Sequence, residues 1–450
     1  MPEAAQTIAE ARGRTLSTNS TARELAQRLQ AARERTLLLA SDLSGGQLLG
    51  PRLAIVNPPL WEIAHVAWFQ EHWCLRYRAP GDLAPSLIKN ADPMYNSAIA
   101  AHDTRWDLPL LPFEAVLRYL AATLERVLER LEREAENPAL RYFAELAACH
   151  EEMHCEAFTY TRQTLGYAPP PGIACAAATG GAWPGDVAVA GGEFPLGAPT
   201  GSGFVFDNEK WAHRVQLAPF SIARAAVTNR EFAAFVDAGG YARRDWWSEA
   251  GWEWRNSARA VAPVYWVKQG SAWQHRVYNR LEPLPLYAAV IHVNWYEADA
   301  WCRWAGRRLP GEAEWEQAAA STPRDPQGKR TYPWGDEAAD ATRANLFGAC
   351  NTPADVAAFE AGDSAWGCRQ LLGNVWEWTA DWFNPYPDFI RDPYQEYSEP
   401  WFGNHKLLRG GCHASSAPLL RNTWRNFYTP DRRDVFAGFR SCAKNVTAPA

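Results

Sequence analysis

Apolar residues in the first third of the chain recur at helical spacing. Within Phe113–Glu134 they stand three or four residues apart, with glutamate and arginine between them, as expected for an amphipathic helix. Similar spacing predicts helices over Arg23–Leu39, Leu60–Tyr77 and Ala139–Leu165. Because one connection is long, over residues 78–111, the pattern predicts a four-helix bundle with a crossover.

The pattern changes near residue 170. The stretch Ala168-Pro-Pro-Pro-Gly172 is stiff and leads into a run of alanine and glycine, which is typical of a boundary between domains. Beyond it, helical spacing is sparse and predicts helices over Asn229–Asp237, Trp295–Trp304 and Gly311–Ala320. Glycine, proline and tryptophan are frequent there, so we expect short strands and few helices.

These patterns divide the chain into four parts. We predict a disordered or loosely ordered N-terminus over residues 1–19, a helical bundle over residues 20–167, a linker over residues 168–184 and a second domain over residues 185–445. Of the 23 tryptophans, 4 precede residue 170 and 19 follow it. The second domain is therefore expected to fill its core with aromatic side chains, because it has little regular structure to do so.

Charge and cysteine content narrow the function. Lysine and arginine number 45 against 51 aspartates and glutamates, a net charge of −6, so nucleic acid and membrane surfaces are poor partners. We see no run of 18 apolar residues and no hydrophobic signal core in the first twenty residues. Nine cysteines without a CxxC pair are typical of reduced thiols. We therefore expect a soluble cytoplasmic protein that acts on small molecules.

Two histidines four residues apart give the strongest local signal for chemistry. In His150-Glu-Glu-Met-His154 both side chains fall on one helical face, where two imidazoles can bind one metal ion; a pair of ordinary surface histidines is the alternative. His65, on the apolar face of the second predicted helix, can supply a third ligand, and His72 competes for that role. Three neutral nitrogens suit Fe(II), Zn(II) or Co(II), and the sequence does not choose among them.

Motifs of the second domain follow a known family pattern. They are Gly192-Glu-Phe-Pro-Leu-Gly197, Val293-Asn-Trp-Tyr-Glu-Ala298, Arg308-Leu-Pro-Gly-Glu-Ala-Glu-Trp-Glu316, Gly373-Asn-Val-Trp-Glu-Trp-Thr379 and Arg409-Gly-Gly411. Residues 185–442 thereby resemble formylglycine-generating, or sulfatase-modifying, enzymes, which implies a C-type-lectin-like, irregular α+β fold. Those enzymes use two cysteines close after Arg-Gly-Gly, whereas here Cys412 is followed by no cysteine until Cys442. This departure argues against oxidation of a sulfatase cysteine.

Both parts together resemble one enzyme family. A DinB-like bundle with a histidine on its second helix and HxxxH on its fourth, joined to a sulfatase-modifying domain, is similar to the ergothioneine/ovothiol sulfoxide synthases and their relatives, the selenoneine synthases. The resemblance covers residues 20–442. It implies a non-haem Fe(II) held by His65, His150 and His154. It also implies that O2 and a chalcogen donor meet hercynine (Nα-trimethylhistidine) there, and that a new bond forms at imidazole C2.

The resemblance implies further site residues. Tyr394, in Asp392-Pro-Tyr394, is expected to donate a proton or hydrogen atom during the oxygen chemistry, with an ordinary packed tyrosine as the alternative, and Tyr397 is expected to line the hercynine pocket. Asn426 matches a position that holds the amino-acid end of hercynine. Because a trimethylammonium group cannot donate hydrogen bonds, aromatic faces are its natural partners. The candidates are Trp401, Phe427 and Tyr428.

Two departures from the sulfoxide synthases bear on the donor. Those enzymes often have glutamine where this chain has Met153, and aspartate where it has Tyr428, so polar partners for γ-glutamylcysteine are missing. A selenosugar, which is a neutral polyol with a selenolate, needs no acidic anchor, and selenoneine synthesis is therefore the favoured interpretation. Arg105, with His102 nearby, is a candidate donor-binding residue.

Three alternatives stay open. The first is a sulfur enzyme that uses γ-glutamylcysteine or cysteine as the donor. The second is a non-catalytic, lectin-like binding module whose bundle holds a metal ion. The third is a zinc-dependent thiol transferase that uses the bundle alone and needs no O2.

Overall fold

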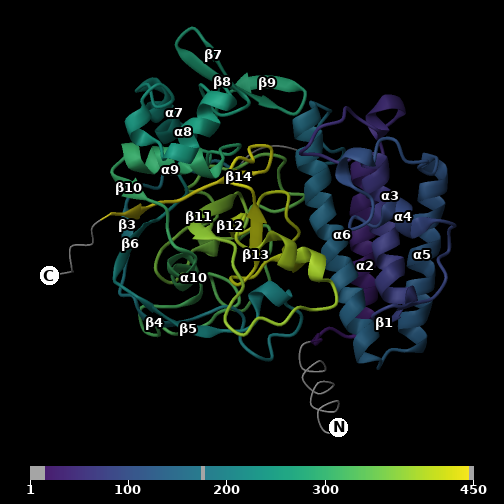
Figure 1. Ribbon diagram of the computed structural model, residues 1–450. Coiled ribbons are helices and arrows are strands. Elements are labelled where there is room, and N and C mark those ends of the chain that lie inside the picture. The colour runs from purple at the N-terminus through teal and green to yellow at the C-terminus, as the bar shows by residue number, and fades with distance from the viewer. Residues whose placement is uncertain (1–15, 174–177, 445–450) are drawn as a thin grey trace. The chain divides into compact units, whose positions relative to one another are not determined.

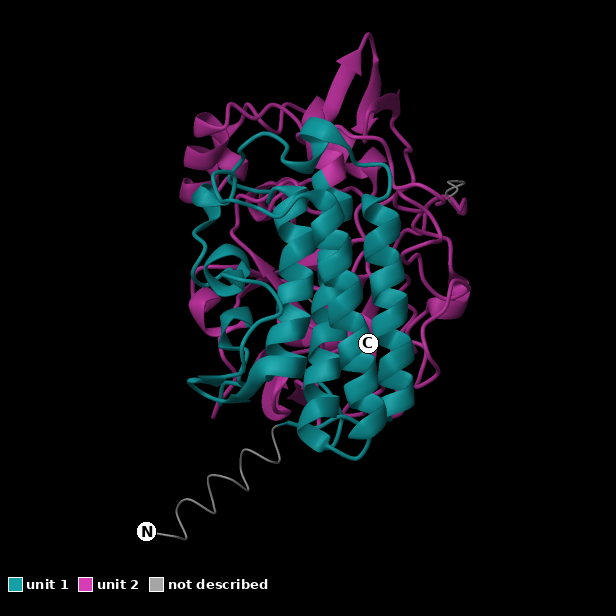
Figure 2. Cartoon of the chain, turned by 90° about the vertical axis from the view of Figure 1, so that its right-hand side faces the viewer, with its two compact units in different colours: residues 1–161, 200–207, 390–397 teal, residues 162–199, 208–389, 398–450 magenta. Residues whose placement is uncertain are grey.

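The computed structural model describes residues 16–173 and 178–444. Most of the predicted loose N-terminus, part of the predicted linker and the last residue of the predicted second domain lie outside these ranges. The chain divides into two compact units: unit 1 comprises residues 1–161, 200–207 and 390–397, and unit 2 the remainder (Figure 2). No helix of the described ranges is long and apolar enough to cross a membrane.

Four long helices form unit 1, and each was predicted from the apolar spacing (Figure 1). They are α2 (Ala22–Ala40), α3 (Pro59–Glu71), α5 (Phe113–Arg133) and α6 (Pro138–Leu165), whose last residues belong to unit 2. Helix α2 starts at a capping box in which Thr21 and Glu24 satisfy each other's backbone N–H groups. The second predicted helix is interrupted, because a π-helix over His72–Arg76 replaces its last turn.

The long crossover of unit 1 carries short elements of its own. These are β1 (Tyr77–Ala79), paired with β2 (Asp82–Leu83), then α4 (Ala91–Tyr95) and a 3-10 turn over His102–Thr104. Helix α4 is held against α3 by two hydrogen bonds: Trp61 Nε1 donates to the carbonyl oxygen of Met94, and Trp68 Nε1 to Asp92, each over 2.7 Å. The crossover is thereby fixed beside α3.

A buried ion pair fixes α6 against α2 inside the bundle. Arg33 of α2 is 3% exposed, and its Nε donates to Glu151 of α6 over 2.7 Å. Thr36, one turn further along α2, donates to the same carboxylate over 2.9 Å. Because Glu151 points to α2, its neighbour His150 is turned to a different face of α6.

Unit 2 is an irregular α+β domain, as the resemblance implied. Its helices are α7 (Asn229–Asp237), α8 (Glu249–Ser257), α9 (Trp295–Trp304) and α10 (Glu312–Ala320). The predicted helices match α7 and α9, and α10 starts one residue late because Gly311 is its N-cap. Helix α8 was missed; its capping residue Ser248, which accepts a hydrogen bond from Gly251 N–H, was the available signal.

Short strands make two four-stranded sheets and smaller ones in unit 2. One sheet has the order β10-β15-β6-β3 and the other β13-β12-β11-β14, in which the β11–β14 pair is parallel. The pair β4-β5 and the ribbon β7-β8-β9 stand apart. The bounds are β3 Asp186–Val189, β4 Gly192–Leu196, β5 His213–Leu217, β6 Phe220–Ala223, β7 Trp266–Gln269, β8 Ala272–Val277, β9 Arg280–Pro283, β10 Arg307–Arg308, β11 Trp376–Trp382, β12 Lys406–Arg409, β13 Arg425–Tyr428, β14 Ala437–Gly438 and β15 Cys442–Ala443.

Aromatic side chains fill the core of unit 2, as the distribution of tryptophan predicted. Trp315, Trp376 and Trp378 are completely buried. Trp376 packs edge-on against Trp424, with ring centres 4.7 Å apart. The excess of tryptophan in this half of the chain is therefore mainly a property of its core.

Candidate metal centre

Three histidines of unit 1 come together between α3 and α6. His65 projects from α3, and His150 and His154 project from one face of α6, one turn apart. One ring nitrogen of each lies within 4.8 Å of the others, and the Nε2 atoms of His65 and His150 are 3.3 Å apart. His65 and His150 are each 3% exposed, while His154 is half-buried. The cluster contains His65, and His72 is not part of it.

Outward hydrogen bonds orient two of the three rings. His65 Nδ1 lies 2.7 Å from the carbonyl oxygen of Tyr95, and His154 Nδ1 lies 2.6 Å from Oε1 of Glu62. A carbonyl and a carboxylate accept hydrogen bonds, so in both rings Nδ1 is the donor, which leaves Nε2 as the nitrogen that can bind a metal. His150 is held by packing, because its ring stacks on Phe69 with the centres 3.5 Å apart.

Burial keeps the histidines in the form that binds metals. It lowers the pKa of His65 well below its usual value, and the neighbouring His154 and Arg105 add to this effect, against the hydrogen bond to Tyr95. Burial, then His154 and His65, likewise lowers the pKa of His150. Both imidazoles are therefore neutral at physiological pH, with lone pairs available.

The donor set fits a divalent transition metal. Converging neutral nitrogens in a buried site suit Fe(II), Zn(II) or Co(II), whereas Mg²⁺ and Ca²⁺ prefer oxygen ligands. Two of the rings also have the outer hydrogen-bond partner that metal-bound histidines usually have. Nδ1 of His150 is buried without a hydrogen-bond partner among the described residues, so this ring is oriented by packing, chiefly against Phe69, and by the contact of its Nε2 with His65.

Tyr394 lies beside the histidine cluster in unit 1. Its ring centre is 4.8 Å from that of Phe69 and 6.0 Å from that of His150, with the ring nearly perpendicular to His150. Burial raises the pKa of Tyr394, and the charges of Glu396 and Asp207 raise it further. The phenol therefore stays protonated at neutral pH and can act as a donor.

Both parts of the chain match known protein families. Residues 28–157 match the DinB superfamily, and residues 175–446 match the sulfatase-modifying factor enzyme 1-like domain. Hercynine oxygenase from Mycolicibacterium thermoresistibile is 38% identical over 434 residues, which cover 93% of this chain and 94% of that protein. The chain belongs to the hercynine oxygenase family. The family member from Mycolicibacterium smegmatis is 37% identical over 92% of this chain and 97% of its own length. Formylglycine-generating enzyme from Streptomyces coelicolor is 35% identical, over 58% of this chain and 90% of its own.

The other candidate residues of unit 1 differ in how firmly they are held. Arg105 is buried: its Nε donates to the carbonyl oxygen of Ala100 over 3.2 Å, and its guanidinium stacks on Trp61 at 3.8 Å. Met153 is half-buried on α6, next to His154. Tyr397 stacks parallel to Tyr394, with ring centres 6.3 Å apart. The predicted substrate contacts of Arg105, Met153 and Tyr397 stay predictions.

Four candidate residues for hercynine binding lie in unit 2. Trp401 is 39% exposed and packs edge-on against His405, with ring centres 5.1 Å apart. Asn426, Phe427 and Tyr428 follow one another on β13, and all three are half-buried. Strand β13 pairs with β12 so that Asn426 lies opposite Leu408 and Tyr428 opposite Lys406. The roles of these residues also stay predictions.

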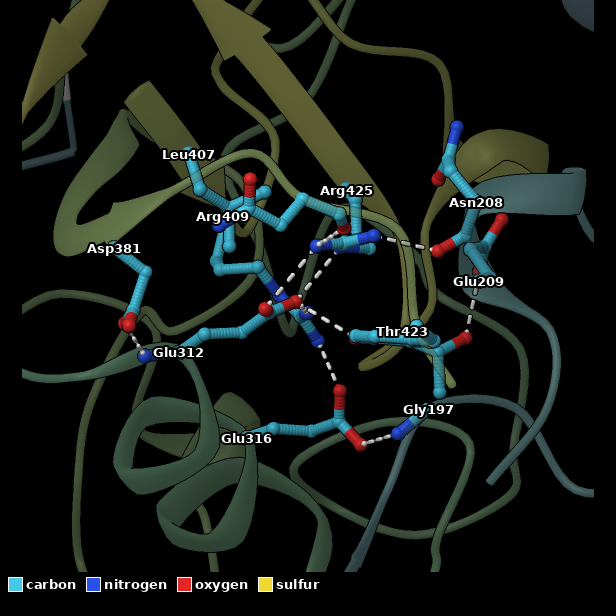
Figure 3. A network of polar contacts seen from close by, with 12 residues as sticks. Gly197, Asn208, Glu209, Glu312, Glu316, Asp381, Leu407, Arg409, Thr423 and Arg425 are labelled. Atoms are coloured by element: carbon cyan, nitrogen blue, oxygen red, sulfur yellow. Dashed lines mark hydrogen bonds and ion pairs between the residues drawn. The ribbon is translucent and has the colours of Figure 1, made fainter. Parts of the chain in front are cut away.

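A buried ionic network holds the start of β13 (Figure 3). Glu312 of α10 accepts from Arg409 over 2.7 Å and lies 2.8 Å from Nε of Arg425, the residue before Asn426. Glu316, one turn on, accepts from Arg409 and from Gly197 N–H. Helix α10 thus fixes two neighbouring strands, and with them the backbone that presents Asn426.

Residues that sequence reasoning missed support the cluster from outside. Glu62 had no predicted role, although it lies three residues before His65 on α3 and so on the same side of the helix. The carbonyl oxygen of Tyr95 has no sequence signature. Tyr142 and Asp392, which hold the segment of Tyr394, are far apart in sequence, and no local pattern could have connected them.

Proposed function

We propose that this protein is a non-haem Fe(II), O2-dependent enzyme that forms a carbon–selenium or carbon–sulfur bond at imidazole C2 of hercynine. The observation that carries the proposal is the buried cluster of His65, His150 and His154 beside Tyr394, in a chain that belongs to the hercynine oxygenase family. The name of that family indicates hercynine as the substrate and O2 as the oxidant, and the three histidines can hold the metal.

The proposed reaction balances with O2 as the only oxidant. The C2–H bond of hercynine and the Se–H or S–H bond of the donor are broken, and one bond forms between C2 and the chalcogen. Forming this bond releases two electrons, and oxidation of the chalcogen to its oxide releases two more. Together they reduce O2, with one oxygen atom in the selenoxide or sulfoxide and the other in water.

The clustered histidines, Phe69 and Tyr394 each have a part in this scheme. His65, His150 and His154 would hold Fe(II), which would supply open coordination positions and one-electron chemistry for O2. The ring of Phe69 and the bundle core keep water from the inner side of the cluster, because His65 and His150 are nearly inaccessible. Tyr394 holds its proton at the phenol oxygen and can deliver it during the oxygen chemistry.

For the donor, we propose a selenosugar. The support comes from the family pattern: Met153 and Tyr428 stand where sulfoxide synthases often have polar partners for a thiol amino acid. The guanidinium of Arg432 lies over the Tyr428 ring at 5.1 Å, and Arg432 is itself paired with Asp434 over 2.6 Å. A selenosugar, whose polyol part is uncharged, needs no carboxylate partner at either position.

A competition experiment tests the proposal. The protein is loaded with Fe(II) without oxygen and then given O2, hercynine and equal amounts of selenosugar, γ-glutamylcysteine and cysteine, and the products are identified by mass. We expect the hercynine–selenosugar adduct to dominate. A dominant sulfur adduct would overturn the donor assignment alone, and the absence of any adduct would overturn the function.

A further inference from the structure

The three histidines have different partners behind them. His154 has a carboxylate, Glu62, at 2.6 Å from its Nδ1; His65 has a neutral carbonyl at 2.7 Å; and His150 has no hydrogen-bond partner at Nδ1 among the described residues. A carboxylate behind a metal-bound histidine orients the ring and raises its basicity more than a carbonyl does, because the hydrogen bond is charge-assisted. The cluster is therefore built with three unequal donors.

Positive charge lies near Glu62, although this carboxylate is buried. It is 1% exposed and lies in the first turn of α3, where the positive end of the helix dipole favours an anion. Arg105, stacked on the adjacent Trp61, supplies a cation: burial lowers the pKa of Arg105 to about 10, and attraction to Glu62 opposes that shift. A buried carboxylate with a cation and a helix N-terminus nearby can hold a strong hydrogen bond to His154.

Helix α3 therefore serves the cluster twice. It carries His65, which points into the cluster, and Glu62, which reaches across to a histidine of α6. The Glu62–His154 hydrogen bond links α3 and α6 at the cluster itself. It orients the His154 ring and helps to hold this ring at its distance from His65.

Resting on the metal-binding part of the proposed function, we propose that Glu62 is a positioning residue that orients His154 and makes it the strongest electron donor of the three histidines. Its carboxylate lies behind His154, on Nδ1, and is not among the ligand atoms of the cluster. Its carboxylate strengthens binding of the metal through His154, and its negative charge favours the ferric over the ferrous state.

Metal affinity of matched variants tests this inference. Dissociation constants for Co(II) and Fe(II) are measured anaerobically by competition with a chromophoric chelator, for the full-length wild type, Glu62→Gln, Glu62→Ala and Glu71→Gln. Glu71 is the matched control, because it is an equally buried carboxylate of α3 that bonds to Leu87 N–H and Ser86 instead of a histidine. We expect Glu62→Gln to weaken binding about 10- to 100-fold, Glu62→Ala to weaken it more, and Glu71→Gln to change it less than about twofold.

Two further readouts separate positioning from a merely structural role. In a His154→Ala background, Glu62→Gln should weaken Co(II) binding much less than it does in wild type, since the carboxylate then acts on the metal through its charge and no longer through a ligand. The Fe(III)/Fe(II) potential of Glu62→Gln should be higher than that of wild type. Equal losses in Glu62→Gln and Glu71→Gln, or a loss of Co(II) affinity that is as large without His154 as with it, would overturn the inference.

Metal affinity and product formation together separate the role of Glu62 from the proposed function. Wild-type protein that binds no transition metal would overturn both. Wild-type protein that binds the metal tightly and depends on Glu62, yet produces nothing from hercynine, would overturn the proposed function and support the role of Glu62. Tight metal binding that is the same in wild type and in the Glu62 variants would overturn only the inference about Glu62.

Discussion

The hydroxyl of Tyr142 donates a hydrogen bond to Oδ2 of Asp392 over 2.7 Å, and both residues belong to unit 1. Tyr142 is on α6, the helix of His150 and His154, and Asp392 lies two residues before Tyr394. Asp392 N–H also donates to Asp207 over 3.1 Å. One helix thus carries two of the clustered histidines and the anchor of the segment that brings Tyr394 to them.

Removing that anchor should impair turnover without affecting the metal. In Tyr142→Phe the ring stays and the hydroxyl is lost, so residues 390–397 are held less firmly. We expect product formation to fall about tenfold, faster amide exchange in this segment, and unchanged iron binding. Tyr119→Phe is the control, because Tyr119 likewise donates to a buried carboxylate, Glu71, away from this segment. Equal activity of the two variants would contradict the role of the anchor.

Replacing Tyr394 itself tests its chemistry. Tyr394→Phe keeps the packing against Phe69 and removes the only proton that the side chain can give. A positioned proton donor contributes about 10²- to 10⁴-fold, so we expect product formation to drop at least 100-fold while the Fe(II) dissociation constant stays the same. The comparison variant is Tyr397→Phe, in which product formation should fall less than in Tyr394→Phe. Full activity of Tyr394→Phe would leave Tyr394 as a packing residue.

The helices and the paired histidines could be predicted because their signals are local. Apolar spacing located α2, α3, α5 and α6, and the four-residue interval placed His150 and His154 on one face. Spacing alone could not decide between His65 and His72 as the third ligand, since both are on the same stretch of chain. The structure chooses His65, which stacks between Trp61 and Trp68 with its Nδ1 on the Tyr95 carbonyl.

Long-range contacts set the limit of the sequence-based prediction. Residues 200–207 and 390–397 belong to unit 1, although a single division near residue 170 places both in the second domain. Tyr142 and Asp392 are 250 residues apart, and no periodicity relates them. The π-helix at His72–Arg76 also has no signal in the spacing, because its residues continue an apolar helical pattern.

The ionic network under β13 should contribute strongly to stability. Glu312→Ala leaves Arg409 and Arg425, both fully buried, without one of their carboxylates. Breaking a buried pair on one side costs about 3–5 kcal/mol in the free energy of unfolding. Asp107→Ala, which breaks the exposed pair with Arg52, should cost less than about 1 kcal/mol. Denaturant titrations measure the free energy of unfolding of both variants. A loss in Glu312→Ala as small as that in Asp107→Ala would mean that the network contributes little to stability.

Stability should fall on mild acidification. Burial lowers the pKa of His292 to about 3 and that of His413 to about 4, whereas both titrate near about 6.5 in the unfolded chain. Between those values the unfolded state binds more protons, so the free energy of unfolding decreases as pH falls from about 6.5 towards 4, by up to about 1.4 kcal/mol per pH unit for each histidine.

Unfolding titrations at pH 7 and pH 4.5 measure this dependence. His413→Gln and His292→Asn should each reduce the difference between the two pH values; asparagine is chosen because His292 has a φ of 62°, which asparagine tolerates. A difference as large as that of wild type in both variants would assign the acid sensitivity to other groups.

Oxygen uptake shows whether this protein joins a chalcogen donor to hercynine at the expense of O2. The Fe(II)-loaded protein is followed with an oxygen electrode in the presence of hercynine, the selenosugar or both, and the adduct is quantified by mass. We expect oxygen uptake only with both substrates, one O2 consumed per adduct formed, and neither uptake nor adduct in His150→Ala. No uptake with any donor, or an adduct formed equally well without O2, would contradict the proposed function.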